Sequence, residues 1–557
     1  MTNVKIPMTN SKRVRRKHKA LRSFTLPQSR FLLIVYLGHL TFVIGHLGCV
    51  GRSGKQIGYV LGTTDKVVTL DPADAYDYLS GNIIQNVFDP LVRYKIGSTE
   101  IEPCLATHWE TSPDGKTYTF TLREGVKFHD GEDLTPRAVK FSLDRARTLG
   151  GDPGFLLDVI EEVTIEEKGT QSGMPAAPGK VIVKLKYPFT AFLSIMAFNA
   201  SVPVSPRAYS LREKHPINPV GTGPYRVKAY REGDLVELET FKDYWGEKPK
   251  TSRVIIKLYG TSSALKLALQ NREVDVAYRT FTPTELEDLR KKPDLQVLEG
   301  ESPAIRYLVM NVTRSPFDRL PIRKSIASAV DREEINQIVH HGTVDPLYSM
   351  IPIGMPGHIP VYRETYGNAD LEKAKEFLKS AGFSEKKKTE IELWFTPTHY
   401  GDVEDELAQV VQRSLEATGI VKVQLQSSEW AEFTDAMVKG HYGLFLLGWY
   451  PDYVDPDDYT YPFLSKEGSK SLGSFYSNPQ MEDLLRRERE EVDMTRRMEI
   501  FREIQNLLAD EVPYVPLFQS KQYAVFQKNI QGILLEPTQI FRYSLISRSS
   551  PLSSIGD

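Results

Sequence analysis

Cysteine is scarce in this chain of 557 residues, which contains only Cys49 and Cys104. Two thiols cannot build a disulfide framework or a four-thiolate metal site. An excess of one charge is also lacking, because 70 Lys and Arg face 72 Asp and Glu, for a formal net charge of −2. Net charge therefore gives no support for a nucleic-acid partner. If Cys49 is modified, Cys104 has no partner, and we expect it to be a plain buried thiol.

Catalytic signatures are missing as well. The sequence has no G-x-S-x-G elbow, no P-loop and no H-E-x-x-H. Gly221-Thr222-Gly223 begins like a dinucleotide loop, but Arg226 stands where a third glycine is needed. His340-His341 lacks the i, i+4 spacing of a metal pair, and His129-Asp130 is better explained as a hydrogen-bonded structural pair. We therefore expect no enzyme activity, no cofactor and no bound metal.

The N-terminus has the composition of a targeting segment. Residues 12–22 are strongly basic, and residues 31–48 form a mostly apolar run that ends at Cys49. A basic region, an apolar region and small residues before a cleavage point are typical of a secretory signal. Leu47-Gly48-Cys49 resembles a bacterial lipobox, in which the cysteine is lipidated and becomes the first mature residue. His46 departs from that pattern, which wants an apolar residue there.

Two alternatives remain for this segment. One is an ordinary cleaved signal or an uncleaved anchor, since about 20 apolar residues cross a bilayer. The other is a buried helix. Translation could also begin at Met8. The leading interpretations place residues 50–557 in the periplasm or at the outer face of the cytoplasmic membrane, and no stretch after residue 50 is long and apolar enough to span a membrane.

Apolar spacing predicts a mixed α/β chain, with room for about three domains at roughly 100–200 residues each. Residues 118–122 alternate as a strand, and Thr135-Pro136 opens a helix as N-cap and first helical position. Residues 391–395 and 421–425 alternate, with helical spacing at residues 407–415 between them. This strand–helix–strand order predicts two parallel strands with a right-handed crossover.

Several separated segments carry a further pattern. They are residues 105–110, 114–120 and 122–131; 221–225 and 243–245; 273–277; Asn311, 316–318, 322–323 and 329–335; and 448–453. From Gln56 to about Gln531 the sequence resembles the family-5 extracellular solute-binding proteins, the group of dipeptide- and oligopeptide-binding proteins. Each segment alone is a weak signal, but their joint order and spacing over nearly the whole mature chain make the resemblance specific.

The resemblance implies an α/β fold of two lobes, the class II periplasmic-binding-protein clam-shell, with an extra inserted domain. Ligand would be buried in the cleft when the lobes close, and the closed form would dock on a membrane permease that two cytoplasmic ATPases drive. The implied organisation is residues 1–49 as signal or lipoprotein segment; 56–100, 210–305 and 511–545 as the first lobe; 101–209 as the inserted domain; and 306–510 as the second lobe.

The resemblance also indicates a ligand site. In the G-W-x-x-D-Y pattern of residues 448–453, Asp452 stands where the peptide-binding members hold the amino terminus of the ligand. Trp430 resembles a second aromatic wall, and residues 76–78 resemble the first-lobe segment that meets the ligand backbone, where an extended peptide could add as a strand. The expected ligand-binding residues are Asp452, Trp449, Trp430, Gly448, Tyr450, Tyr76, Asp77 and Tyr78.

Each of these residues has a structural alternative. Trp449 and Trp430 could be core tryptophans. Asp452 lies in an acid-rich stretch, residues 452–458, that could be a solvated turn or a calcium cluster, although its prolines and the missing central glycine argue against a regular EF-hand loop. Residues 76–78 could be a surface turn, and the glycines of residues 221–224 have a structural reading as a tight turn.

The sequence leaves three functional hypotheses open. The first is capture of di- or oligopeptides by a monomeric, lipid-anchored binding component of an ABC importer. The second keeps the fold and role but takes a non-peptide solute, such as a metal chelate, an opine or an oligosaccharide. The third is a secreted hydrolase or a peptide-holding chaperone. An ammonium anchor at Asp452 is needed only by the first.

Overall fold

The computed structural model describes residues 58–167, 178–215, 217–279, 281–397, 399–400 and 403–549. The chain divides into two units, Met1–Gly54 and Lys55–Asp557, and every described residue belongs to the second. The predicted signal segment, His46 and Cys49 lie outside the described residues. Across those that are described, no helix combines the length and the apolar character needed to cross a membrane.

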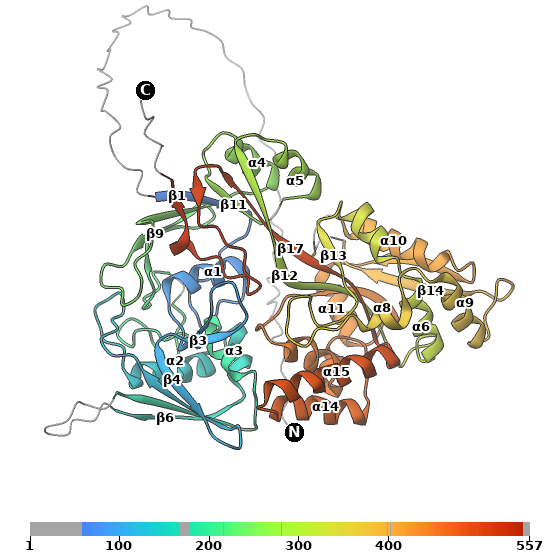
Figure 1. The fold of residues 1–557 in the computed structure, drawn as a ribbon, viewed down its shortest axis with the longest axis horizontal. Helices are drawn as coiled ribbons and strands as arrows, with labels where there is room; N and C mark the ends of the chain where they lie inside the picture. Colours follow the sequence, from blue (N-terminus) through green and yellow to red (C-terminus); the bar gives the residue numbers. More distant parts are fainter. Residues whose placement is uncertain are drawn as a thin grey trace, which may run out of the picture. The chain divides into compact units, whose positions relative to one another are not determined.

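A mixed sheet of eleven strands runs through the second unit (Figure 1). Its central strands β12 and β17 are long, at 16 and 14 residues. The order across the sheet is β15 (Val421–Ser427), β14 (Thr389–Phe395), β16 (Leu444–Trp449), β12 (Leu295–Met310), β17 (Tyr514–Gln527), β11 (Val276–Tyr278), β1 (Gly58–Thr63), β10 (Arg253–Leu258), β9 (Leu235–Thr240) and β8 (Tyr225–Arg231), and β13 (Val344–Pro346) also pairs with β17.

Strands β12 and β17 connect two lobes. Residues 295–301 of β12 pair with residues 521–527 of β17; the register then shifts, and residues 305–309 pair with residues 514–519. Pro303 lies in the shift, where its missing N–H costs no ladder hydrogen bond. The start of β17 packs in the core of one lobe and its end in the cores of the other. The lobes therefore divide within this strand pair, and the expected boundary between residues 305 and 306 falls inside β12.

The first lobe is built on β1, β8 to β11 and the adjoining ends of the two long strands. Tyr59 and Leu61 of β1 are buried in its core. Three helices belong to it: α1 (Tyr78–Val87), α4 (Ser262–Gln270) and α5 (Pro283–Arg290). Thr282 begins α5 with a capping box, in which its hydroxyl and the Glu285 carboxylate each accept a backbone N–H.

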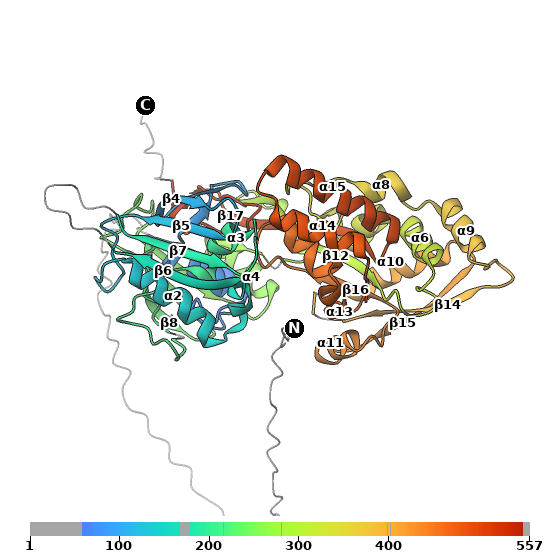
Figure 2. The ribbon, with the colours of Figure 1, turned by 90° about the horizontal axis from the view of Figure 1, so that it is seen from below.

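A separate antiparallel sheet has the order β4 (Ala106–Thr111), β5 (Thr117–Leu122), β7 (Lys180–Leu185) and β6 (Ile160–Glu166) (Figure 2). Tyr118, Phe120 and Leu122 are buried, which confirms the alternation seen in the sequence. Helix α2 (Pro136–Leu149) packs against this sheet, and Thr135 caps it as predicted. Strands β2 (Val92–Tyr94) and β3 (Ile101–Pro103) pair beside it, and Cys104 is a buried free thiol.

The second lobe contains the predicted strand–helix–strand unit. Strands β14 and β15 are parallel and are connected by α10 (Glu404–Glu416), which buries Leu407, Val411 and Leu415. The prediction of a parallel pair is therefore confirmed. The other described α-helices are α3 (Phe192–Met196), which precedes this lobe, and α6 (Leu320–Ala329), α7 (Arg332–Glu334), α8 (Val361–Tyr366), α9 (Leu371–Ser380), α11 (Trp430–Val438), α12 (Tyr461–Leu464), α13 (Lys466–Ser471), α14 (Pro479–Glu490) and α15 (Met494–Glu511).

Candidate functional site

The segment after β16 carries the acid expected to bind ligand. Trp449 is the last residue of β16, and the chain then passes through Asp452 to a short 3-10 turn, Pro456–Tyr459. The carboxylate of Asp455 accepts a hydrogen bond from the N–H of Asp457 and so caps that turn. Residues 450–458 are named the acid loop.

Arginines neutralise two acids of the acid loop. Arg497 donates hydrogen bonds of 2.9 and 2.8 Å to Asp455, and Arg489 donates hydrogen bonds of 2.6 and 2.9 Å to Asp457. Burial acts to raise the pKa of Asp457, but the charge of Arg489 and the hydrogen bonds to this carboxylate together outweigh burial and hold that pKa far below its usual value. Both acids are structural, and within the described residues no group of three or more His, Cys, Asp or Glu is arranged to hold a metal ion.

Asp452 and Asp458 have no such partners. Within the part of the chain that the structure describes, neither forms an ion pair with a basic side chain. Asp458 is fully buried, and its Oδ2 accepts hydrogen bonds from the N–H of Asp452 at 2.9 Å and from Nε1 of Trp449 at 3.1 Å. Asp458 therefore fixes the positions of two expected ligand residues. Burial raises the pKa of Asp452 to about 6, against a smaller lowering by a hydrogen bond from Tyr76.

The hydroxyl of Tyr76 donates that hydrogen bond to Oδ1 of Asp452. Tyr76 lies just before α1 in the first lobe, and the contact connects residues 376 positions apart. The ring of Tyr76 meets Phe155 edge-on, with centroids 6.0 Å apart, and 42% of the residue is exposed. The expected ammonium acceptor therefore lies at a junction between the two lobes.

Asp77 and Tyr78 have other partners. Asp77 is the N-cap of α1, and its carboxylate accepts a 3.0 Å hydrogen bond from the N–H of Ser80. The Tyr78 hydroxyl lies 2.5 Å from that of Tyr278, and the guanidinium of Arg279 lies 3.7 Å from the centroid of the Tyr78 ring. Arg279 has a φ of 63°, in the left-handed region that non-glycine residues rarely adopt. The Asp77 carboxylate therefore caps α1, and the Tyr78 side chain contacts Tyr278 and Arg279.

The two tryptophans lie at the edge of the second lobe's core, and both are partly buried. Trp449 meets Phe463 edge-on, with centroids 5.1 Å apart. Trp430, the first residue of α11, stacks on His399 with centroids 3.6 Å apart and planes 3° apart, and Tyr400 meets its edge at 5.7 Å. Neither tryptophan is an interior core residue, so each keeps some surface outside the core.

Gly448 makes room for an arginine that the sequence pattern did not indicate. Arg306 of β12 lies opposite Gly448 in the sheet, is 5% exposed, pairs with Glu404 and lies 3.8 Å from the centroid of the Tyr400 ring. A Cβ at position 448 would lie 2.7 Å from the Tyr400 ring and 2.8 Å from Nη1 of Arg306. By contrast, Tyr450 is 53% exposed. No local spacing marks Arg306, because Glu404 lies 98 positions away.

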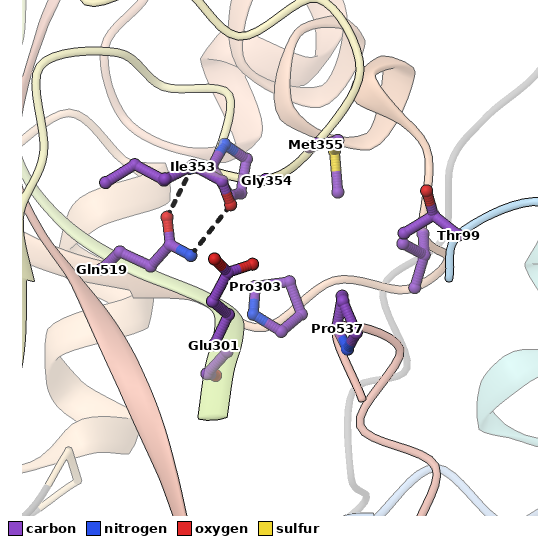
Figure 3. Close-up of a pocket in the computed structure, with 11 residues that line it drawn as sticks. Thr99, Glu301, Pro303, Ile353, Gly354, Met355, Gln519 and Pro537 are labelled. Carbon is purple, nitrogen blue, oxygen red and sulfur yellow. Dashed lines mark hydrogen bonds between the residues drawn. The ribbon is translucent and has the colours of Figure 1, made fainter. Parts of the chain in front are cut away.

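A separate hollow lies beside the two long strands (Figure 3). Its lining combines Thr99 and Pro537 of the first lobe with Val454 of the acid loop. The side-chain amide of Gln519 accepts a 2.6 Å hydrogen bond from the N–H of Ile353 and donates one of 3.2 Å to its carbonyl. None of the expected ligand residues lines this hollow, so it does not coincide with the site around Asp452.

Two α/β lobes that share a pair of long strands, with an acid at their junction, define a two-lobed solute-binding protein. The family model of the bacterial extracellular solute-binding proteins, family 5 (middle region), matches residues 100–471. The chain belongs to this family, whose members are binding proteins, and the expected α/β clam-shell fold is confirmed.

Relatives extend the similarity over most of the chain. The dipeptide-binding protein of Escherichia coli K12 is 28% identical over 477 residues, which cover 81% of this chain and 87% of that protein. DppA of Helicobacter pylori, an ABC transporter-associated periplasmic binding protein in complex with the peptide STSA, is similar with a TM-score of 0.71 and 25% identity over 88% of this chain and 98% of that one. A dipeptide-binding protein of Pseudoalteromonas sp. SM9913, in complex with Met-Leu, gives a TM-score of 0.70 and 25% identity, covering 88% and 100%.

Proposed function

We propose that this protein is the extracytoplasmic solute-binding component of an ABC importer and that it captures small peptides between its lobes. The observation that carries the proposal is Asp452, a carboxylate at the lobe junction with a raised pKa and, among the described residues, no basic partner. The ammonium group of a peptide supplies the missing positive charge. The dipeptide- and peptide-binding relatives support the same class of ligand.

The remaining expected residues are assigned around that ammonium. Tyr76 already donates to Oδ1 of Asp452, which leaves Oδ2 for the ligand. Trp449 and Trp430 offer aromatic surface to ligand side chains, with Gly448 and Tyr450 beside them. Asp77 and Tyr78 act less directly, through the start of α1 and through the backbone of residues 76–78.

Binding is proposed to shift the protein toward its closed form, because a peptide that meets both Asp452 and the first lobe makes its full set of contacts only there. The hinge is assigned to the register shift of β12 and β17 around Pro303, where the ladder is interrupted. On this division, residues 56–100, most of 210–305 and the later part of 511–545 form the first lobe with residues 101–209 as its inserted domain, and the second lobe spans roughly 306–510 together with the start of β17.

The cellular setting follows from the same role. The protein would work as a monomer in the periplasm or at the outer face of the cytoplasmic membrane, held there by lipid on Cys49. One lipid chain anchors a protein only marginally, so more than one chain or an added contact is needed. The closed form would deliver peptide to a membrane permease driven by cytoplasmic ATPases.

Calorimetric titration of residues 50–557 with a dipeptide and with its N-acetylated form tests the proposal. Asp452→Ala should weaken dipeptide binding by about 30-fold to several thousand-fold, the effect of truncating one partner of a buried charge pair. N-acetylation should weaken binding to the wild type comparably. Asp133→Ala, at an exposed acid, is the matched control.

Unchanged dipeptide affinity in Asp452→Ala would remove the basis of the ammonium assignment. Native mass spectrometry of the purified protein distinguishes the alternative solutes, because a co-purified metal chelate, opine or oligosaccharide has a mass unlike that of a peptide. Cleavage products after incubation with peptides would instead indicate a hydrolase.

A further inference from the structure

The acid loop contains a second carboxylate that the ammonium assignment does not use. Asp458 is fully buried, and its Oδ2 is occupied by the N–H of Asp452 and by Nε1 of Trp449. Its other oxygen, Oδ1, is buried and has no hydrogen-bond partner among the residues that the structure describes. A buried carboxylate oxygen in that state costs folding free energy, so either a proton or a ligand donor is needed there.

The two acids lie close together, and among the described residues neither has a basic side chain as an ion-pair partner. The backbone of Asp452 is hydrogen-bonded to the side chain of Asp458, while the loop's two arginines, Arg489 and Arg497, are engaged by Asp457 and Asp455. The other titratable groups that interact with the pair are the phenols Tyr76 and Tyr94 of the first lobe, Tyr453 and Tyr459, and the acid Asp457. Asp152 and Asp455 interact in turn with the phenols of Tyr76 and Tyr94.

From this geometry we propose that Asp458 is the second acid of the ligand site, that Asp452 and Asp458 hold one proton between them in the ligand-free protein, and that the cationic group of the ligand displaces it. The inference rests on the proposed function and adds to it the requirement that the ligand carry a cationic group. Two adjacent carboxylates cannot both ionise cheaply in a buried site until a cation lies beside them.

The titration of the pair agrees with this arrangement. Burial and the neighbouring Asp452 raise the pKa of Asp458 well above its usual value, and burial raises the pKa of Asp452 to about 6. The proposal assigns to the pair a single negative charge at neutral pH, with the proton on Asp458. When an ammonium group enters, Asp458 loses its proton to the buffer, and two carboxylates then face the cation. No other bond forms or breaks.

Calorimetry of the wild type with a dipeptide, in phosphate and in Tris at pH 7, counts the protons, because released protons add the ionisation enthalpy of the buffer to the measured heat. We expect a heat difference equal to a large fraction of one proton per ligand. Dipeptide affinity should also rise as the pH increases above 6, by up to about tenfold per pH unit.

Asp458→Asn is the informative variant, because it is close to isosteric and its side-chain oxygen can still accept from Asp452 and Trp449. The buffer-dependent heat should disappear and dipeptide affinity at pH 7 should fall about tenfold or more, the scale of removing one charge-assisted contact. Asp133→Asn should change neither quantity.

Equal heats in the two buffers for the wild type would overturn the inference even if the peptide binds well, and this measurement does not depend on any variant folding. Absence of peptide heat in every buffer is a different result, because it would count against the proposed function itself. Full proton release by a folded Asp458→Asn protein would assign the proton to another group and would also overturn the inference.

Discussion

At the scale of single residues, the acids of the acid loop differ in their hydrogen-bond partners. Asp457 is stabilised as a carboxylate by Arg489, whereas the one side-chain partner of the Asp452 carboxylate among the described residues is the Tyr76 hydroxyl. The lowered pKa of Asp457 means that its ionised form is favoured in the folded protein, whereas ionising the half-buried Asp452 without a basic partner reduces folding stability. This cost is a mark of function, because strained or unpaired charges persist at binding sites.

Asp452→Asn should therefore stabilise the fold while it weakens binding. Burial raises the pKa of Asp452 to about 6 from an ordinary 3.8, so its cost is fully present above pH 6 and is lost as the pH falls toward 4. Urea unfolding should show a gain on the order of 1–3 kcal/mol at pH 8 that shrinks at pH 5. Asp457→Asn, by contrast, should lose about 3–5 kcal/mol, the cost of breaking a buried ion pair. A less stable Asp452→Asn protein at pH 8 would contradict this account.

Gly448→Ala tests the close approach of Arg306 and Tyr400. The added methyl group would sit 2.7 Å from the Tyr400 ring, so the ring or strand β16 must shift. Overpacking of this kind costs about 1–3 kcal/mol, which urea unfolding measures. Gly260→Ala is the control, since a Cβ there meets nothing within 4 Å. An equal effect of both variants would mean that crowding at Gly448 is not the cause.

At the scale of elements, the turn of residues 221–224 packs closely against the C-terminal end of α1. A Cβ at Gly221 would lie 2.3 Å from the carbonyl oxygen of Val87, the last residue of α1. His129 packs under this turn, where its Nδ1 accepts from the N–H of Gly221 at 3.3 Å and its Nε2 lies 3.0 Å from the carbonyl of Gly223. The neutral imidazole fits both contacts, so His129 bonds to this turn, while the neighbouring Asp130 has a separate partner in the hydroxyl of Ser205.

His129 should make the fold sensitive to mild acid. Burial lowers its pKa to about 4 from an ordinary 6.5, so the unfolded chain binds the proton first and stability falls as the pH decreases from about 6.5 to 4. The loss should be on the order of 3 kcal/mol in urea unfolding at pH 7 and pH 4. His129→Gln should remove most of this pH dependence, and His108→Gln, at an exposed residue, should leave it unchanged. Unaltered pH dependence in His129→Gln would assign the acid sensitivity elsewhere.

Elements with local patterns were predictable from the sequence, and contacts between distant segments were not. The alternation of β5, the Thr135 cap of α2 and the parallel pair β14 and β15 depend on neighbours in sequence, so periodicity identified them. The expected lobe boundary between residues 305 and 306 came from the family resemblance and falls inside β12; periodicity alone could not locate it, because a strand shows no break in its pattern where its partners change. The partnership of Asp458 with Trp449 was missed for another reason, since a run of acids does not show which of them meets an arginine.

At the scale of the whole molecule, the lobes meet at a second place besides Tyr76 and Asp452. Thr190, between β7 and α3, donates its N–H to the carbonyl of Arg489 at 3.0 Å and its hydroxyl to the carbonyl of Glu491 at 2.8 Å. The guanidinium of Arg489 lies 4.8 Å from the centroid of the Phe189 ring. Since Arg489 also holds Asp457, this contact and the acid loop share one side chain.

Thr190→Val should weaken peptide binding without touching the site. The change keeps the shape and removes one hydrogen bond between the lobes, worth about 0.5–1.5 kcal/mol, so the closed form is less populated and the dipeptide Kd should rise about two- to tenfold. Calorimetry measures the affinity, and small-angle scattering should show a more expanded ligand-free ensemble that contracts when peptide is added. Thr164→Val, on an exposed position of β6, is the matched control. A higher Kd with unchanged scattering would indicate a local effect through Arg489 rather than a change in lobe closure. An unchanged Kd would show that the Thr190 contact does not take part in closure.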